Sequence, residues 1–436
     1  MRKPIKKTIV KKKKFTLSFL FLLAAEVIYS FSAYIIVAFL GRMLGPADYG
    51  RYALVTGVAT MITILVARGV PTAMMKRISE NQENHKLVYA IRKTAISVQA
   101  PIVISITILY FFLTPLIADM LGDSTLVPLL RISTLIIPLF ALSSFYVLYL
   151  NGLKSFKALA VIKSLRGIIR IFAVIGFAYL FSLEGSIFGA AVAPLVLFVV
   201  AIFISSYIEP HKLKIPKENT IAAYPHKKLL SYAGGFILFL ILYEFYIRMD
   251  LYLIKALLGD DATTGLYDAA VKIALLPFFG VYALTLMLFP TMSELAEKKD
   301  LAGIRKHLNT IGLLLAGALP LGAIILYYFR DFLMQLFFGE EFLPAADLIP
   351  YMLGATIFMT VFYILASVLN GAGHTKVTWS ILMVGVSTGV ILNLIYIPIH
   401  GATATAAIFS LTSIIMGISS LFCAYRLFYK PLGKQK

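Results

Sequence analysis

"GRMLGPADYGRYAL" (41–54) interrupts two long apolar runs with three glycines, one proline, two arginines and one aspartate. A similar stretch, "LGDDATTGLYDAA" (258–270), returns in the second half of the chain. Gly45, Gly50 and Tyr52 correspond there to Gly259, Gly265 and Tyr267. A single polar turn is a local signal, but its recurrence indicates that the chain contains two copies of one structural unit.

The composition is that of a membrane protein. Hydrophobic residues make up 60% of the 436 residues, charged residues 14%, and the mean hydropathy is +0.88. Soluble proteins have about 45–50% apolar and about 25% charged residues. The recurring apolar runs are long enough to cross a bilayer as helices, and too continuous for the strands of a barrel. Twelve transmembrane helices are predicted: 16–40, 52–70, 94–114, 126–150, 158–181, 186–208, 229–258, 268–290, 308–329, 346–369, 377–398 and 402–428.

The basic residues predict the orientation of these spans. Of the 40 lysines and arginines, 30 fall in the two tails and the loops after even-numbered spans. The loops on the other side hold few cations, namely Arg42, Arg51, Arg131, Lys255, Lys272 and Arg330, and several acidic residues. Positive charge marks the cytoplasmic side, so a multi-pass protein of the cell membrane with both termini in the cytoplasm is expected. The first apolar run is too long for a signal peptide and is predicted to be a retained span.

Two further pairs of turns extend the repeat. Gly122 corresponds to Gly339, and Asn151 in "LNGLKSF" (150–156) corresponds to Asn370 in "LNGAGHTK" (369–376). All pairs occur in the same order, 214 to 219 residues apart. Six helices per copy give both halves the same orientation, as in transporters with parallel repeats, whose halves face each other across a cleft. The predicted domains are a basic tail (1–14), a first six-helix lobe (15–208), a polar cytoplasmic linker (209–228), a second lobe (229–428) and a short tail (429–436).

The quoted stretches resemble a known family. "FLGRMLGPADYGRYAL" (39–54), "RGVPTAMMKRISE" (68–80) and "MDLYLIKALLGDDATTGLYDAAVKI" (249–273) are similar to the polysaccharide-transporter, Wzx-type flippases. These belong to the multidrug/oligosaccharidyl-lipid/polysaccharide (MOP) exporters, and the resemblance runs from about residue 15 to 428. It implies a MATE-like, twelve-helix transporter in two lobes. It also implies a lipid-linked oligosaccharide on a polyprenyl or dolichyl phosphate or pyrophosphate as cargo, moved from the inner to the outer leaflet by alternating access.

Ionisable residues within spans are the candidate cargo or coupling residues, because charges in a membrane are costly. They are Glu26, Arg68, Glu244, Arg248, Asp250, Asp268 and Lys272, with Arg166 and Arg170 as weaker candidates. Arginines suit a phosphate because a guanidinium binds its oxygens bidentately. The carboxylates would neutralise these cations or carry a coupling H⁺ or Na⁺. Glu244–Arg248 and Asp268–Lys272 share an i,i+4 spacing that allows each pair to meet on one helix face.

Each candidate also has a structural interpretation. Arg166 would extend its head to the cytoplasmic interface, and Glu244–Arg248 would join two helices. Arg68 would contact lipid headgroups, and Asp268 and Lys272 would lie in the outer interface. In the related fold the first two helices of each lobe line the cleft, which favours Glu26, Glu244, Arg248 and Lys272. The polar turn at 41–54 is interpreted first as a structural turn, and second as part of a gate.

Other classes of function have little support in the sequence. The chain has no phosphate-binding GxxxxGK[ST] loop, and its six histidines show no metal-ligand spacing, so no ATP hydrolysis, metal or other cofactor is expected. The net charge of +19 is explained by the cytoplasmic side and by attraction to anionic lipid, without nucleic acid. The main alternative is a cation-coupled multidrug exporter of the same fold. A glycan polymerase or ligase would need a larger outer loop, and an uncoupled lipid scramblase also stays open. The protein is expected to be no enzyme, although a glycan polymerase or transferase is a conceivable partner.

Overall fold

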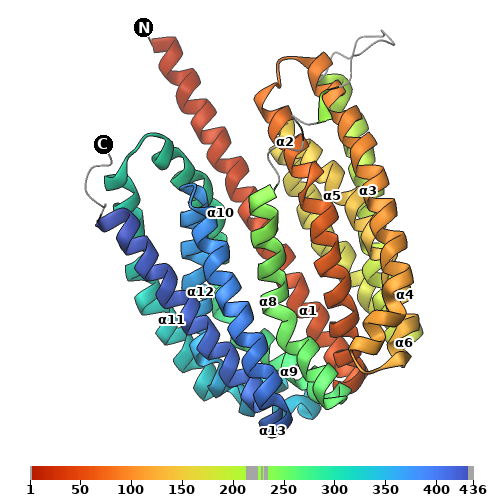
Figure 1. The fold of residues 1–436 in the computed structure, drawn as a ribbon. Helices are drawn as coiled ribbons and strands as arrows, with labels where there is room; N and C mark the ends of the chain where they lie inside the picture. Colours follow the sequence, from red (N-terminus) through yellow and green to blue (C-terminus); the bar gives the residue numbers. More distant parts are fainter. Residues whose placement is uncertain (1, 213–223, 227–228, 230–233, 431–436) are drawn as a thin grey trace. The chain divides into compact units, whose positions relative to one another are not determined.

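The computed structural model describes residues 2–212, 224–226, 229 and 234–430 (Figure 1). Over these residues the regular elements are helices, and the described part of the chain contains no strand. The prediction of an all-α polytopic membrane protein is confirmed. The predicted linker 209–228 and the tail 429–436 lie largely outside the described residues, as do the side chains of residues 1–27 and with them Glu26.

The first half of the chain forms helices α1 to α6. Their bounds are α1 (Arg2–Arg68), α2 (Val70–Glu80), α3 (His85–Met120), α4 (Val127–Ser133), α5 (Ile136–Gly152) and α6 (Phe156–Lys212), with a 3₁₀ turn at Ser124–Leu126. In the second half they are α8 (Gly234–Leu258), α9 (Asp261–Ala274), α10 (Leu276–Glu297), α11 (Leu301–Phe337), α12 (Ile349–Gly371) and α13 (Thr375–Ala424). A 3₁₀ segment, Glu340–Leu348, precedes α12, and a π-helical turn, Tyr425–Tyr429, follows α13.

Three of these helices contain a chain reversal. α1 breaks at Gly45 (φ 69°), α6 at Phe181 and Ser182, and α13 at Gly401 (φ 61°). Positive φ is accessible to glycine without strain, so one residue suffices to end one span and begin the next. Each of these three helices therefore corresponds to two predicted spans, whereas α4 with α5, and α9 with α10, each correspond to one. Counted in this way, the described helices follow the twelve predicted spans. Seven uninterrupted stretches of described residues are long and apolar enough to cross a membrane, and three of them contain one of these reversals.

The predicted loop at 41–51 is helical except at Gly45. Pro46 follows this break directly, at the start of the second part of α1. Proline is well placed in a first helical turn because its fixed φ suits a helix and its missing N–H has no partner there in any case. The turn is therefore a single residue, and Asp48 to Arg51 lie on a helix instead of in a loop.

The contacts divide the chain into two compact units. Unit 1 comprises Met1–Val37, Val58–Pro115 and Val127–Gly234, and unit 2 comprises Ala38–Gly57, Leu116–Leu126 and Gly235–Lys436. Two segments from the first half thus belong to the same unit as the whole second half, whereas the predicted lobes follow chain order. We call residues 38–57 the hairpin segment.

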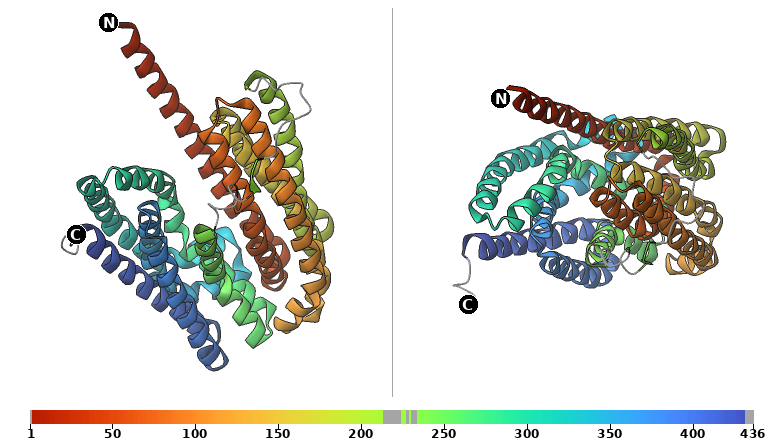
Figure 2. Two further views of the ribbon diagram at one scale, coloured as in Figure 1. Left: turned by 45° about the horizontal axis from the view of Figure 1, so that its top comes forward. Right: turned by 90° about the horizontal axis from the view of Figure 1, so that it is seen from above.

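Each unit has an apolar core between its helices. In unit 1, α2, α3 and α5 meet around Met74, Ile91 and Tyr149. In unit 2, α8, α12 and α13 enclose the aromatic side chains of Tyr246, Phe362 and Phe409. Both views of Figure 2 show α12 beside the two arms of α13. Many large apolar side chains on the outer faces of the helices stay exposed, as expected for surfaces that contact lipid.

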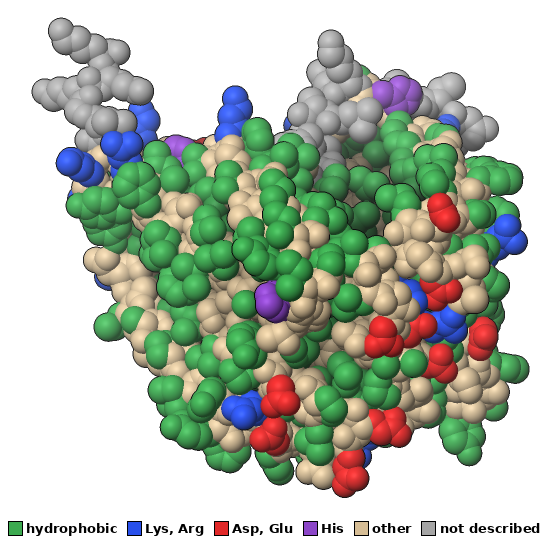
Figure 3. Space-filling view, turned by 60° about the horizontal axis from the view of Figure 1, so that its bottom comes forward, with side chains coloured by type: hydrophobic (Ala, Val, Ile, Leu, Met, Phe, Trp, Pro, Cys, Tyr) green, Lys and Arg blue, Asp and Glu red, His purple; other side chains and the backbone are tan. Residues whose placement is uncertain are grey.

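Glycines with a positive φ lie at six turns of the described part of unit 2, and five of these turns follow odd-numbered spans. Gly45, Gly122, Gly259, Gly339 and Gly401 all have positive φ. Each follows an odd-numbered span, so alternation of the spans places all five at one end of the unit, which we call the hairpin end. The φ values of Gly45 and Gly259 agree closely, at 69° and 71°, and those of Gly122 and Gly339, at 69° and 97°, share the positive sign. The backbone supports the internal repeat. Figure 3 turns this end toward the viewer and shows acidic side chains gathered among hydrophobic ones.

Candidate functional site

Both predicted i,i+4 ion pairs of the second half form in unit 2. Arg248 Nε lies 3.2 Å from Glu244 Oε2 on α8, with the two side chains about one-fifth exposed. Lys272 Nζ lies 3.1 Å from Asp268 Oδ1 on α9. The sequence spacing therefore gave both pairings correctly.

The two pairs belong to one electrostatic group. Glu244, Tyr252 and Asp268 all act electrostatically on the Arg248 guanidinium. Two cations and two carboxylates make the group neutral, so neither cation is an uncompensated charge in an apolar unit. Such a group can receive an anion only if that anion replaces a carboxylate or if a carboxylate gains a proton.

The hairpin segment passes directly beside this group. Tyr49, which is fully buried, donates a hydrogen bond of 2.8 Å from its hydroxyl to Asp268 Oδ2. A Cβ built on Gly57 would lie 3.1 Å from the Tyr252 hydroxyl and 3.3 Å from Arg248 Nη1. Asp268 therefore links the hairpin segment to Lys272. The small residue at position 57 leaves room for the Arg248 head.

Asp250 lies in a separate, buried polar layer. Its side chain is 4% exposed and accepts hydrogen bonds from the Tyr267 hydroxyl (2.9 Å) and from Asn393 Nδ2 (2.8 Å). Asn393 Oδ1 is buried and has no hydrogen-bond partner among the described residues. On the same helices, the Tyr246 hydroxyl lies 2.8 Å from Thr412 Oγ1. The layer thus holds one carboxylate with neutral partners and one unused acceptor oxygen.

The sequence prediction missed part of this layer. Asn393 and Thr412 were not among the candidates, although Asn393 is a polar residue within an otherwise apolar run. That interruption was the available signal. Tyr267 was noted only as a member of the repeat. Its hydrogen bond to Asp250 depends on the approach of α9 to α8, which one sequence does not reveal.

The first-half candidates belong to unit 1. Arg68 is exposed at the end of α1, and Arg170 is partly buried on α6. The Arg166 guanidinium lies 4.5 Å from the centre of the Tyr29 ring and 4.9 Å from that of Phe140. Stacking on two aromatic rings gives Arg166 a packing role in unit 1.

A second group of charges, not among the candidates, lies at the hairpin end. Lys255 Nζ is 2.8 Å from Asp123 Oδ2 and 2.6 Å from Asp261 Oδ1, and its side chain is only 2% exposed. Arg51 approaches the same two carboxylates, with Nε 3.1 Å from Asp261 Oδ2 and Nη2 3.6 Å from Asp123 Oδ2. We call these four residues the charge cluster. From the sequence they were only loop charges, but Arg51 and Lys255 stood out as cations on the side that has few.

The cluster holds Asp123 firmly in its charged form. Burial tends to raise the pKa of this carboxyl, but hydrogen bonds from Lys255 and Thr125 outweigh it and lower the pKa from 3.8 to about 2. Beside it, Asp260 caps the N-terminus of α9 by accepting from the N–H groups of Ala262 and Thr263. Hydrogen bonds from Thr263 lower the pKa of Asp260 as well. Both aspartates are therefore anions at neutral pH.

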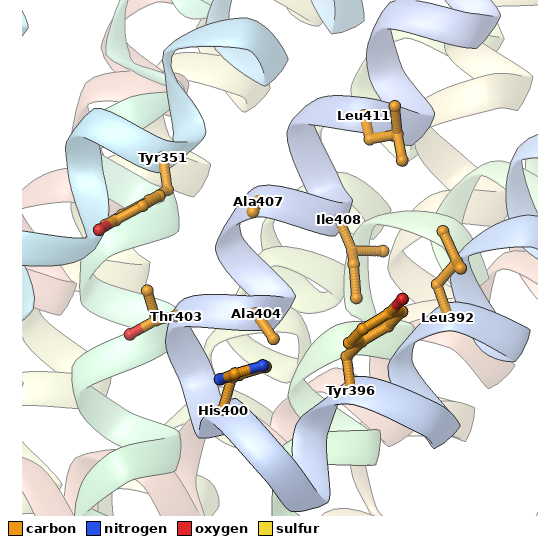
Figure 4. A pocket seen from close by; sticks show the side chains of 9 residues that line it. All are labelled: Tyr351, Leu392, Tyr396, His400, Thr403, Ala404, Ala407, Ile408 and Leu411. Carbon is orange, nitrogen blue, oxygen red and sulfur yellow. The ribbon is translucent and has the colours of Figure 1, made fainter.

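A hollow of about 750 Å³ lies on another part of unit 2, between α12 and α13 (Figure 4). Tyr396, His400 and Thr403 stand near the Gly401 reversal, and Ile408 and Leu411 line the far part. The hollow contains none of the predicted site residues. Glu244, Arg248, Asp268 and Lys272 therefore form packed ion pairs and do not line this hollow.

Comparisons with known proteins place the chain in a family. Residues 16–296 match the family described as polysaccharide biosynthesis protein, well over half of the chain. An uncharacterized membrane protein of Methanocaldococcus jannaschii is 27% identical over 248 residues, which are 54% of this chain and 47% of that protein. The chain thus spans about half the length of that relative. Stage V sporulation protein B of Bacillus subtilis is 26% identical over 352 residues, 76% of this chain and 68% of that one.

Solved structures show the same fold. An inward-facing multidrug resistance MATE family transporter of the MOP superfamily has a TM-score of 0.71 at 12% identity, covering 93% of this chain and 98% of that one. The lipid II flippase MurJ, in an inward closed conformation, has a TM-score of 0.70 at 17% identity, covering 92% and 87%. Similarity at such low identity shows the architecture. The chain therefore belongs to the polysaccharide biosynthesis family, and its fold is that of these two solved transporters.

Proposed function

We propose that this transporter flips a lipid-linked oligosaccharide from the cytoplasmic to the outer leaflet by alternating access, for the assembly of a cell-surface glycan. The family's description, polysaccharide biosynthesis, supports a glycan cargo. The phosphate or pyrophosphate that joins glycan to lipid needs cations inside the membrane, because a charged group cannot enter hydrocarbon alone. The observation that carries the proposal is the neutral group of two cation–carboxylate pairs in unit 2.

The two pairs suggest how the headgroup would be bound and released. A phosphate would replace Glu244 at Arg248 or Asp268 at Lys272, so that each cation exchanges one anion for another. Neither cation would at any stage be left unpaired in a low-dielectric site, where an unpaired charge is strongly unfavourable. The guanidinium would supply bidentate contacts and the lysine a single point charge. The lipid tail would stay in the bilayer throughout.

The test is the sidedness of the cargo in cells. In a strain without this protein and without a redundant flippase, the complete lipid-linked glycan should accumulate on the cytoplasmic leaflet. A membrane-impermeant glycan probe applied to sealed vesicles of known orientation measures the fraction on each side. Re-expression should restore the outer fraction. An unchanged pool with unchanged sidedness would contradict the proposal, and drug export would be tested next.

We further propose that Asp250 carries the coupling ion. This carboxylate is buried, its hydrogen-bond partners Tyr267 and Asn393 are neutral, and Asn393 also carries an acceptor oxygen, Oδ1, that has no partner among the described residues. Such a layer can accept either a proton on the carboxylate or a small cation between the oxygens. An ion bound there would offset the carboxylate's charge in an apolar core.

Thermal stability in detergent distinguishes the two ions. A ligand that binds only the folded state raises the melting temperature with its concentration. If Na⁺ is the ion, Na⁺ at constant ionic strength should stabilise the parent protein, and Asp250→Asn should remove the effect. Glu294→Gln, at an exposed ion pair, is the matched control. If Na⁺ has no effect on the melting temperature, the proton is the remaining candidate for the coupling ion. Transport in vesicles with an imposed pH gradient then tests it.

The proposed cellular setting follows from the same reasoning. The cell membrane is the expected location, with both termini in the cytoplasm and the hairpin end facing outward. A glycan polymerase or transferase would consume the flipped product on the outer side.

A further inference from the structure

The charge cluster joins four segments that are distant in the sequence. Arg51 comes from the hairpin segment, Asp123 from the turn after α3, Lys255 from the end of α8, and Asp261 from the start of α9. The first two belong to the first repeat and the last two to the second. All four lie in unit 2 at the hairpin end. The cluster is therefore a polar connection between the two copies of the repeat.

Lys255 is the centre of this connection. Its ammonium contacts both carboxylates and lies 3.4 Å from the carbonyl oxygen of Gly259, while its side chain is 2% exposed. Arg51 adds a second cation on the partly exposed side, and it also donates to Thr125. The buried ammonium has few alternatives to these partners, so removing the lysine or a carboxylate leaves a buried charge uncompensated.

The same two segments touch through their backbones. A Cβ built on Gly50 would lie 2.3 Å from the carbonyl oxygen of Asp261 and 2.8 Å from the nitrogen of Gly265. Gly50 and Gly265 are repeat partners, so the two copies meet at equivalent positions. Tyr49 fastens the hairpin segment to α9 again, through Asp268. α9 thus carries Asp261 of the cluster and, two turns or about 10 Å further on, the Asp268–Lys272 pair.

The contact between the hairpin segment and helices α8 and α9 is ionic at the charge cluster, and this chemistry suits a contact that opens and closes. An apolar seam between these segments would expose hydrophobic surface to water whenever it opened. An ion cluster at the end of a membrane protein behaves differently, because its charges gain water as they separate and lose it again as they close. The cluster is also neutral overall, so neither state accumulates net charge. A reversible contact at a water-accessible end is expected to have this chemistry.

We propose that Lys255, Arg51, Asp123 and Asp261 form an ionic latch that holds the hairpin segment against α8 and α9, and that the latch must dissociate for the hairpin end to open. The inference rests on the proposed transport by alternating access, but not on the identity of the cargo. Lys255 is a positioning residue, since it acts through the segments it joins. Displacement of Asp268 from Lys272 by a cargo phosphate would disturb the Tyr49 hydrogen bond and so favour release of the latch.

The test measures access to the buried side of α9. Thr264 has no exposed surface, and Thr264→Cys in a Cys423→Ser background gives a single reporter thiol. Intact cells are treated with a membrane-impermeant maleimide, and the initial labelling rate is measured. Lys255→Met should raise this rate about tenfold, because losing the central ion pair shifts the equilibrium toward the open form. Lys298→Met, at a 64% exposed lysine paired with Glu294, is the control that should leave the rate unchanged.

Further variants keep the test decisive if Lys255→Met does not fold. Arg51 and Asp123 are more exposed than Lys255, so Arg51→Gln and Asp123→Asn replace it as probes. Each should raise labelling. Asp123→Asn combined with Lys255→Met should add little to the effect of Lys255→Met alone, as expected for members of one network. Folding is checked by a monodisperse elution profile in detergent.

Labelling within about twofold of the parent in folded Lys255→Met and Arg51→Gln proteins would overturn the latch. So would equal increases in the Lys298→Met control. The readout needs no cargo, which separates it from the leaflet assay. Increased labelling together with unchanged glycan sidedness in the deletion strain would support the latch and reject the glycan cargo. Unchanged labelling together with altered glycan sidedness in the deletion strain would reject the latch and support the glycan cargo.

Discussion

At the scale of single residues, Glu244 occupies the Arg248 guanidinium that a cargo phosphate would need. Glu244→Gln should strengthen phosphate binding, because it removes the anion that competes for Arg248 while keeping the shape of the side chain. Arg248→Ala should abolish most of the binding and transport. The measurement is the shift in melting temperature with an increasing concentration of pyrophosphate, where tighter binding gives a larger shift.

Glu294→Gln is the matched control for this prediction. Glu294 is also the acidic member of an i,i+4 pair, with Lys298, but both side chains are well exposed. Its loss should leave the pyrophosphate response unchanged. Transport at the parent rate by a folded Arg248→Ala protein would remove Arg248 from the cargo site.

The lowered pKa of Asp123 sets the pH range over which the charge cluster stabilises the folded state. Its pKa is lowered from 3.8 to about 2, so the folded state binds the proton more weakly than the unfolded state. Its contribution is fully present above pH 3.8 and is lost as the pH falls toward about 2. The difference in melting temperature between the parent and Asp123→Asn should therefore be constant from pH 5 to pH 8. It should shrink below pH 4, and a difference that already changes between pH 5 and 7 would contradict the assignment.

At the scale of elements, the contact between the hairpin segment and α9 depends on two glycines. Gly50→Ala places a methyl group 2.3 Å from a backbone oxygen that cannot rotate away, so the segments must separate. We expect a loss of stability on the order of 1–3 kcal/mol and faster labelling of the Thr264→Cys reporter. Gly317→Ala on α11, where a Cβ would meet no atom within 4 Å, is the control and should be neutral or slightly stabilising. Equal effects of the two substitutions would show that the close approach is unimportant.

The sequence predicted the elements well where apolar runs and glycines define them. Spans were recognised from length and hydropathy. Gly259 and Gly401 lie beside predicted span boundaries, and Gly45 lies within the predicted loop between the first two spans, where a positive φ favours glycine. Residues 46–51 were taken as a loop because they are polar, although they are helical. Polarity reports the surroundings of a segment at the membrane surface, whereas helix formation there depends on Pro46 and on packing against α9. The short helix α2 was missed for the same reason.

At the scale of the whole molecule, partners that are close in sequence were predictable and distant ones were not. The Glu244–Arg248 pair follows from a spacing of four residues on one helix. The contacts of Lys255 with Asp123 and of Asp250 with Asn393 join positions more than a hundred residues apart. No pattern in a single sequence predicts such long-range contacts. The internal repeat predicted which turns of the two halves are equivalent. It did not show that Gly50 and Gly265 touch.

The orientation in the membrane is the prediction on which the direction of transport depends. Thr403 and Lys376 are both exposed; Lys376 lies at the start of the first arm of α13, and Thr403 lies just after the Gly401 reversal that ends this arm. With the hairpin end outside, Thr403→Cys in the Cys423→Ser background should react with an impermeant maleimide in intact cells. Lys376→Cys should react only after the membrane is permeabilised. The charge distribution predicts this result, because 30 of the 40 basic residues fall in the tails and in the loops after even-numbered predicted spans, as Lys376 does. The opposite labelling pattern would place the latch in the cytoplasm, where it would control cargo entry instead of release.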